Sequence, residues 1–156
     1  MGTNLMRAAV VVSAICWAVG VAQGGASWVP PAYSMTISTH ISSINQVVSD
    51  STNMTLSHDV ACTIAVSVAV AGDDVLTLSP SGPTLTTAYM LTGNLSNPDG
   101  AWVASATFIN GAKTYLVIGT GPNSTITLSV QATPPSNQAP DAGTYTAKIT
   151  LTASWL

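Results

Sequence analysis

The chain has 156 residues, enough for one domain, and only 6% of them are charged. Three basic residues against six acidic ones exclude a nucleic-acid-binding surface, because nucleic-acid binding needs a basic face that displaces counterions. The low charge and the many Val, Thr, Ile and Ser residues exclude an intrinsically disordered chain and are typical of an all-β protein.

The first 22 residues predict a secretory signal peptide. Residues 1–7 contain the only arginine, Arg7, and are followed by fifteen uncharged residues, AAVVVSAICWAVGVA. A basic start, a short apolar run and small residues at its end are the features of such a peptide, and the run is too short to span a bilayer comfortably. We predict cleavage after Ala22, with Ala26 as the alternative, and export of the remaining chain.

Residues 23–42 predict a linker followed by a separate strand. Pro30 and Pro31 prevent regular strand pairing in the linker. Beyond them, residues 33–41 alternate between apolar and polar side chains, which indicates a strand with one buried face. The residues of that face are Tyr33, Met35, Ile37, Thr39 and Ile41. We place the main β domain at residues 43–156.

The middle of the chain predicts short strands separated by turns. The expected strands lie at residues 52–56, 60–70, 75–78, 84–91, 101–109, 114–118 and 126–130. Gly, Pro, Asn and Asp residues separate them, and no stretch outside the signal peptide has a convincing helical period. Short strands at this spacing are typical of a β-sandwich.

Two turn signals are stronger than the others. Asn97-Pro98-Asp99-Gly100 predicts a turn. Asn110-Gly111 predicts a two-residue hairpin between the strands at residues 101–109 and 114–118. In this interpretation the buried side chains of the first of these strands are Trp102, Ala104, Ala106 and Phe108.

Candidate catalytic and metal-binding residues are few. The two histidines are His40, expected to be solvated on the polar face of a strand, and His58, expected to form a turn with Asp59. Asp73-Asp74 is interpreted as a turn, because a calcium site needs several spaced oxygen ligands. We therefore expect no enzymatic activity, no catalytic residue, no bound metal and no cofactor.

One cysteine, Cys62, remains after the predicted cleavage, so no internal disulfide is expected in the exported chain. It lies in the strand VACTIAVSVAV, on the same face as Val60 and Ile64. We expect it to be a small core residue. The alternative, an intermolecular disulfide, requires an exposed thiol.

The last strand has the clearest alternation in the chain, and it continues to the end of the sequence. Its apolar positions are Tyr145, Ala147, Ile149, Leu151, Ala153 and Trp155, and polar residues occupy the positions between them. No later strand is available to pair with it, while residues 33–41 form a spare strand behind a linker. The simplest solution is intermolecular: the N-terminal strand of one copy pairs with the last strand of another.

These terminal motifs resemble those of chaperone–usher pilus subunits. Gly143 is fourteenth from the end, Trp155 is next to last, and apolar residues alternate between them. The segments APDAGTYTAKITLT and MTISTHI resemble the ends of alpha-type, colonisation-factor major subunits. Archaic, spore-coat-U-like pilins are the second resemblance, although many of those have a cysteine pair that is missing here.

The resemblance implies an incomplete immunoglobulin-like β-sandwich that is completed by a donor strand from a neighbouring subunit. A periplasmic chaperone would first pair with residues 145–155, and an outer-membrane usher would exchange it for residues 33–41 of the next subunit. The expected product is a homopolymeric fimbria on the bacterial surface that supports adhesion or biofilm formation. A tip adhesin is a further candidate partner.

A different class of function remains open from the residues alone. A secreted, monomeric β-sandwich could bind a glycan or a coat partner through exposed aromatic side chains. Trp28, Tyr89 and Tyr115 are the candidates for such a surface, although packing in the core explains Tyr89 and Tyr115 equally well.

Overall fold

The computed structural model describes residues 9–12, 27–29, 35–37, 47–58, 62–73, 75–78, 82–111, 113–119, 121–134 and 144–155. These residues form an almost entirely β structure with one short helix, which confirms the predicted all-β class. Within the same residues, no helix has the length and apolar character needed to cross a membrane.

The strands in chain order are β1 (Ala9–Val12), β2 (Ser27–Val29), β3 (Met35–Ile37), β4 (Val48–Ser57), β5 (Cys62–Gly72), β6 (Leu76–Leu78), β7 (Thr84–Gly93), β8 (Val103–Ala104), β9 (Tyr115–Gly119), β10 (Asn123–Thr133), β11 (Thr144–Thr146) and β12 (Ile149–Trp155). The helix α1 (Ser105–Asn110) lies between β8 and β9. The predicted short strands at residues 52–56, 75–78, 84–91, 114–118 and 126–130 are thereby confirmed to within a few residues.

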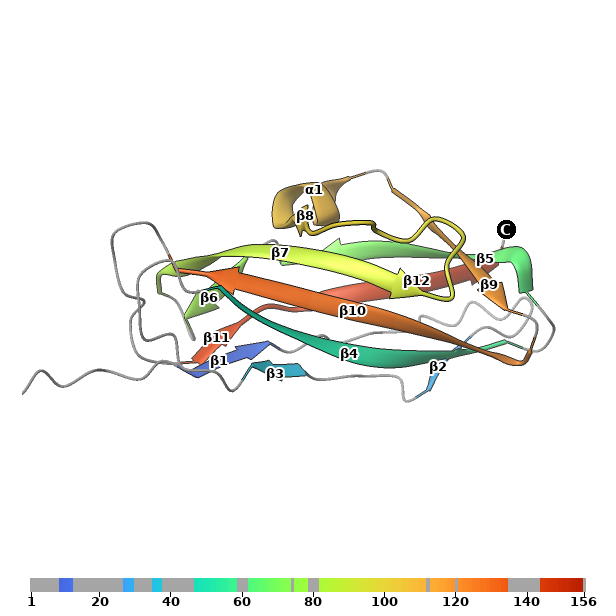
Figure 1. The fold of residues 1–156 in the computed structure, drawn as a ribbon, viewed down its shortest axis with the longest axis horizontal. Coiled ribbons are helices and arrows are strands. Elements are labelled where there is room, and N and C mark those ends of the chain that lie inside the picture. Colours follow the sequence, from blue (N-terminus) through green and yellow to red (C-terminus); the bar gives the residue numbers. More distant parts are fainter. Residues whose placement is uncertain are drawn as a thin grey trace, which may run out of the picture.

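The strands form two sheets (Figure 1). The larger sheet has the order β2-β4-β10-β7-β6-β11-β1-β3, with β8 paired to β7, and the smaller sheet has the order β12-β5-β9. Neighbouring strands are antiparallel except for β1 and β11, which are parallel. Most of the antiparallel pairs, such as β4 with β10 and β5 with β12, join strands that are not consecutive in the chain.

One hydrophobic core is shared by the two sheets. The larger sheet contributes Met54, Leu56, Leu85, Tyr89, Leu91, Ile126, Leu128 and Val130, and the smaller sheet contributes Val66, Val68, Tyr115, Val117, Ile149 and Leu151. Along β7 and β10 these residues occupy alternate positions, because successive side chains of a strand point to opposite faces. Burial of this alternating set holds the two sheets together.

The C-terminal strand, predicted as one uninterrupted strand, is divided between the two sheets. β11 pairs with β6 and β12 pairs with β5, and the break falls at Ala147 and Lys148. Asp73 lies beside this break: its backbone N–H donates to the Lys148 carbonyl oxygen at 2.8 Å, and its Oδ2 accepts from the Lys148 N–H at 2.8 Å. The preceding Gly72 has a φ of 137°, which a residue with a side chain rarely adopts.

The hairpin predicted at Asn110-Gly111 is wrong, because residues 105–110 form the helix α1. Gly111 has a φ of −67°, not the positive value that a two-residue hairpin of this type requires, and its N–H donates to the Thr107 carbonyl oxygen. Phe108 is buried, as expected, but Trp102 is 37% exposed, and Ala104 and Ala106 are exposed. The helix places Phe108 against Tyr89, with ring centroids 5.1 Å apart.

Candidate functional site at the edge of the C-terminal strand

The strand β12 is paired on one side only, as far as the described residues extend. Its partner is β5, with Ile149 opposite Gly72 and Trp155 opposite Val66. β12 is the terminal strand of its sheet, so its other edge has no strand neighbour within the described part of the chain. An edge of this kind presents backbone N–H and C=O groups that a further strand can bind.

The outward-facing backbone groups of β12 belong to its odd-numbered residues. In an antiparallel pair, successive residues point their N–H and C=O groups alternately toward and away from the partner strand. The Leu151 carbonyl oxygen points away from β5, because it accepts a hydrogen bond from the Trp28 side chain. Ile149 and Ala153, two residues away on either side, share this orientation by the same alternation.

The side chains of these odd-numbered residues face the core. Tyr145, Ala147, Ile149 and Leu151 are each at most 3% exposed, and Ala153 is partly buried against the core. The burial alternation predicted for the C-terminal strand is confirmed for these residues. A strand added at the β12 edge would therefore bind the backbone of core-facing residues and extend the cover over the core.

Trp28 connects β12 to the opposite sheet. β2 pairs with the end of β4, with Trp28 opposite Leu56. The Trp28 side chain is 2% exposed, and its Nε1 donates to the Leu151 carbonyl oxygen at 3.1 Å. The indole therefore spans the space between the edge of β4 and the edge of β12, and it satisfies one of the outward-facing carbonyl groups of β12.

The edge of β11 is occupied by β1, which lies in the predicted signal peptide. Ala9 is opposite Thr144 and Val10 is opposite Tyr145. On the far side of β1 lies β3, with Ile37 opposite Val10, and β3 also packs beside β4 (Figure 1). β1 and β3 thus lie between β11 and β4.

Among the described residues, β3 of the predicted donor strand does not pair directly with β11 or β12 of the predicted acceptor strand. Met35 and Ile37 belong to β3, which β1 separates from Tyr145. Tyr33, Thr39, Ile41 and Gly143 lie outside the described residues, and so does His40. The predicted pairing is between two copies of the chain, and it stays a prediction.

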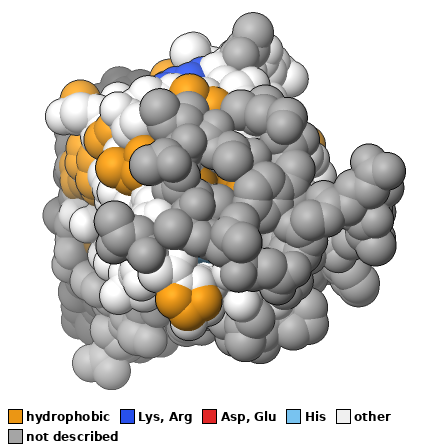
Figure 2. All heavy atoms as spheres, turned by 90° about the vertical axis from the view of Figure 1, so that its right-hand side faces the viewer, with side chains coloured by type: hydrophobic (Ala, Val, Ile, Leu, Met, Phe, Trp, Pro, Cys, Tyr) orange, Lys and Arg blue, Asp and Glu red, His pale blue; other side chains and the backbone are white. Residues whose placement is uncertain are grey.

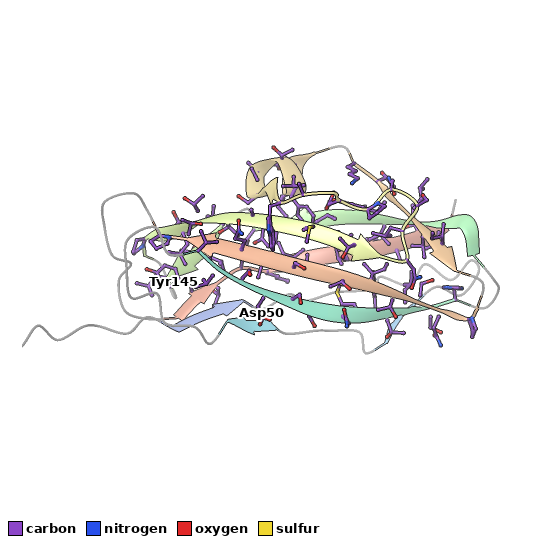
Figure 3. The ribbon with its side chains drawn as sticks, in the orientation of Figure 1. Asp50 and Tyr145 are labelled. Carbon is purple, nitrogen blue, oxygen red and sulfur yellow. The ribbon has the colours of Figure 1, made fainter. Side chains whose placement is uncertain are left out.

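Asp50 is a residue of this region that the sequence analysis did not single out. It lies on β4 in line with the core-facing Val48 and Met54, but it is only partly buried, as is Thr52. Figure 3 shows Asp50 and Tyr145 in the half of the molecule where β1 and β3 lie. Polar residues at two consecutive core-facing positions of a strand are the signal that could have identified this incompletely covered stretch.

His58 is buried, and Asp59 lies outside the described residues, so the turn predicted for this pair stays a prediction. The His58 side chain is 1% exposed, its Nε2 lies 2.9 Å from Ser124 Oγ, and its backbone N–H donates to the Pro122 carbonyl oxygen. An added Cβ on Gly119 would lie 2.5 Å from Ser124 Oγ, so the chain packs closely over this pair. The pair joins the ends of β4, β9 and β10 and has no access for a substrate.

A second buried polar group is Asp99, in the predicted turn at residues 97–100. Its carboxylate accepts hydrogen bonds from the Leu91 N–H and the Tyr115 hydroxyl, both at 2.8 Å, and forms an ion pair with Lys113 at 2.6 Å. Burial, with the hydrogen bond to Asp99, raises the pKa of Tyr115 far above its usual range. All of these contacts are internal, and they attach the 97–100 segment to β7 and β9.

The aromatic residues proposed for a binding surface are not exposed. Trp28 is 2% exposed, so its assignment to an exposed surface is wrong. Tyr115 is 2% exposed and Tyr89 is fully buried, which confirms the alternative that these two residues pack in the core. Trp102 is the large aromatic side chain that is exposed in the described part of the chain. Figure 2, which shows the right-hand end of the molecule in Figure 1, has uncharged side chains and backbone over most of its described surface.

No metal-binding constellation is found among the described residues. No protein-family model matches the sequence, and no curated protein matches it. A functional assignment therefore depends on the residues and geometry of the chain itself, of which the β12 edge is the most distinctive feature.

Proposed function

We propose that this protein is a structural subunit of a surface fimbria, polymerised by donor-strand exchange. The observation that carries the proposal is the outer edge of β12, where Ile149, Leu151 and Ala153 direct backbone groups away from the sheet and side chains into the core. This arrangement suits the addition of a strand, which contributes backbone hydrogen bonds and covers the core at the same time. The proposed fold is an incomplete immunoglobulin-like sandwich that another copy completes.

The signal peptide adds to this proposal. Removal of residues 1–22 would take away β1, which pairs with β11 and with β3. Within the described residues, the mature chain would then have an unpaired edge along both β11 and β12, and β3 would lose the strand with which it pairs. Both consequences favour exchange, because the edge of β11 then lacks a neighbouring strand and β3 lacks a strand to pair with.

The energies are large enough for a stable joint. Burial of Tyr33, Met35, Ile37 and Ile41 from a neighbouring copy contributes about 1.5–3 kcal/mol for each side chain, as an upper estimate. Backbone pairing adds to this. A mature subunit, without residues 1–22 and without a partner, lacks these contributions, so its folded state depends on a bound strand.

The proposed pathway follows from the export of such a subunit. A periplasmic chaperone occupies the free edge first, and an outer-membrane usher exchanges it for residues 33–41 of the next subunit. The product is a cell-surface homopolymer that supports adhesion or biofilm formation. The role is structural, and it assigns no catalytic residue, metal or cofactor to the chain.

Deletion of residues 34–41 tests the proposal. The wild-type chain, expressed with its chaperone and usher, is expected to give heat-resistant ladders on a denaturing gel. The deletion variant is expected to lose the ladder and to retain chaperone binding, because the acceptor edge is intact. An unchanged ladder in the variant, or a mature wild-type chain that stays a soluble monomer in the presence of the chaperone and usher, would contradict the proposal and favour a monomeric binding module.

A further inference from the structure

β2 and β3, the described part of the predicted donor strand, both lie beside β4. β2 pairs with Thr55–Ser57 at one end of β4, and β3 packs beside β4. Only residues 30–32 separate Val29 from the predicted donor strand at residues 33–41. Because Trp28 is buried and hydrogen-bonded to Leu151, β2 is a well-anchored part of this segment.

Chain length decides where β2 goes when residues 33–41 leave for a neighbouring copy. An extended strand of nine residues covers about 30 Å. Its C-terminal end stays attached to β4 through residues 42–47, so its N-terminal end lies farthest from the parent subunit. The four residue steps from Val29 to Tyr33 span about 14 Å at most. This reach is too short for β2 to remain on its own β4.

The edge of β4 also has room for only one β2. The resident β2 is paired with residues 55–57 of β4, so a second copy of β2 cannot pair with the same three residues at the same time. An arriving strand therefore displaces the resident β2. It brings its own β2, since the copies are identical, and each contact made within one chain can be remade between two chains.

We infer that the exchanged segment begins at β2 and that Trp28 is its N-terminal anchor. In the fibre, the Trp28 indole of one copy donates to the Leu151 carbonyl oxygen of the partner subunit and packs opposite the partner's Leu56. The partner for this surface is a second copy of the chain. The inference rests on the proposed function and extends its interface from residues 33–41 to residues 27–41.

With this arrangement, the edge of β12 selects an arriving strand by more than its alternating apolar residues. The subsite next to Leu151 holds a large, flat side chain with an N–H donor, which Trp provides and the aliphatic residues of the donor strand do not. An arriving strand that lacks this residue leaves the Leu151 carbonyl group without its donor. The subsite therefore favours strands from copies of this chain over other alternating strands.

Paired cysteines in assembled fibres test the inference. Val29 and Thr55 are opposite each other on β2 and β4, and opposite residues of antiparallel strands lie within the Cα separation of a disulfide. The double variant Val29→Cys, Thr55→Cys is compared with each single variant and with the wild-type chain, which retains Cys62. The matched control is Asn53→Cys, Thr127→Cys, an opposite pair on β4 and β10, which are not exchanged.

Fibres are collected from cells, oxidised, boiled and separated without reductant. The Val29–Thr55 variant is expected to give a covalent ladder that reductant converts to monomers, and the Asn53–Thr127 variant is expected to give only monomers. Internally cross-linked monomers, or no disulfide, in fibres of the Val29–Thr55 variant would overturn the inference and leave the fibre proposal intact. If the wild-type chain forms no fibre at all, the proposed function fails and the inference with it.

Discussion

The Trp28 indole nitrogen donates to the Leu151 carbonyl oxygen at 3.1 Å, although the two residues are 123 positions apart. This hydrogen bond connects the N-terminal segment to the strand β12 at the edge that we propose to be the acceptor. It links the stability of the single chain to the same contact that we infer for the fibre.

Two substitutions at Trp28 separate its packing from its hydrogen bond. Trp28→Phe keeps most of the buried ring and should reduce the free energy of unfolding by about 1–2 kcal/mol, because the Leu151 carbonyl group loses its donor. Trp28→Ala should reduce it by about 3–5 kcal/mol, because a cavity remains. Urea denaturation of the monomeric full-length chain measures both values. Equal, small effects would show that the indole is not an anchor.

Substitutions on the two faces of β3 should affect assembly differently. Ile37→Asp places a charge on the predicted buried face of the donor strand and should abolish the heat-resistant ladder, because a buried, unpaired charge is very unfavourable. Thr36→Asp introduces the same side chain on the polar face and is the matched control, with little expected effect. Band patterns from cells that express either variant give the comparison. Loss of the ladder in both variants, or in neither, would count against a face-specific donor strand.

The Asp99 carboxylate should contribute far more to stability than its ion-pair partner. Asp99→Ala leaves the Leu91 N–H and the buried Tyr115 hydroxyl without their acceptor and should reduce the free energy of unfolding by about 3 kcal/mol. Lys113→Ala removes a side chain that is 40% exposed and should cost less than about 1 kcal/mol. Chemical denaturation of the two variants side by side provides the test, and similar losses would refute this ranking.

The raised pKa of Tyr115 predicts a loss of folding stability at alkaline pH. Burial holds the pKa of its hydroxyl above the ordinary value of 10.0, so above pH 10 the unfolded chain releases this proton while the folded chain keeps it. The contribution is complete below pH 10 and falls by about 1.4 kcal/mol for each pH unit up to the folded pKa. The difference in free energy of unfolding between wild type and Tyr115→Phe, measured from pH 8 to pH 11, should shrink above pH 10. A constant difference would contradict the assignment.

The all-β class and most strands could be predicted from the sequence, because their signal is local. Side chains two residues apart share a face, so the alternation from Tyr145 to Leu151 identified the buried residues correctly. The division of that strand at Lys148 could not be predicted in this way. It depends on contacts with Asp73, 75 residues earlier in the chain.

The helix α1 was missed because the local signal and the tertiary contacts disagree. Asn110-Gly111 favours a hairpin in isolation. In the folded chain, Phe108 packs against Tyr89 and Tyr115, and the helix brings its ring into that position. The preference of a dipeptide is small compared with the burial of an aromatic ring, so the tertiary contacts determine the outcome.

The candidate site was predicted in outline and not in detail. The sequence indicated the C-terminal strand as an edge and residues 33–41 as a strand for it. It indicated Trp28 only as a candidate for an exposed surface and not as a contact of the C-terminal strand, because one aromatic residue before two prolines has no periodic pattern. The partnership of His58 with Ser124, 66 residues apart, was likewise invisible, since a single polar residue does not show which other residue it contacts.

Hydrogen exchange of the β12 amides tests the central claim most directly. In the monomeric full-length chain, the amides of Ile149, Leu151 and Ala153 should exchange much faster than those of Thr150, Thr152 and Ser154, which face β5. Addition of a synthetic peptide with the sequence of residues 27–41 should slow the three odd-numbered amides to the rate of their neighbours. Odd-numbered amides that are already protected in the free chain, or that keep exchanging quickly with the peptide in excess, would contradict the claim that β12 is an acceptor edge.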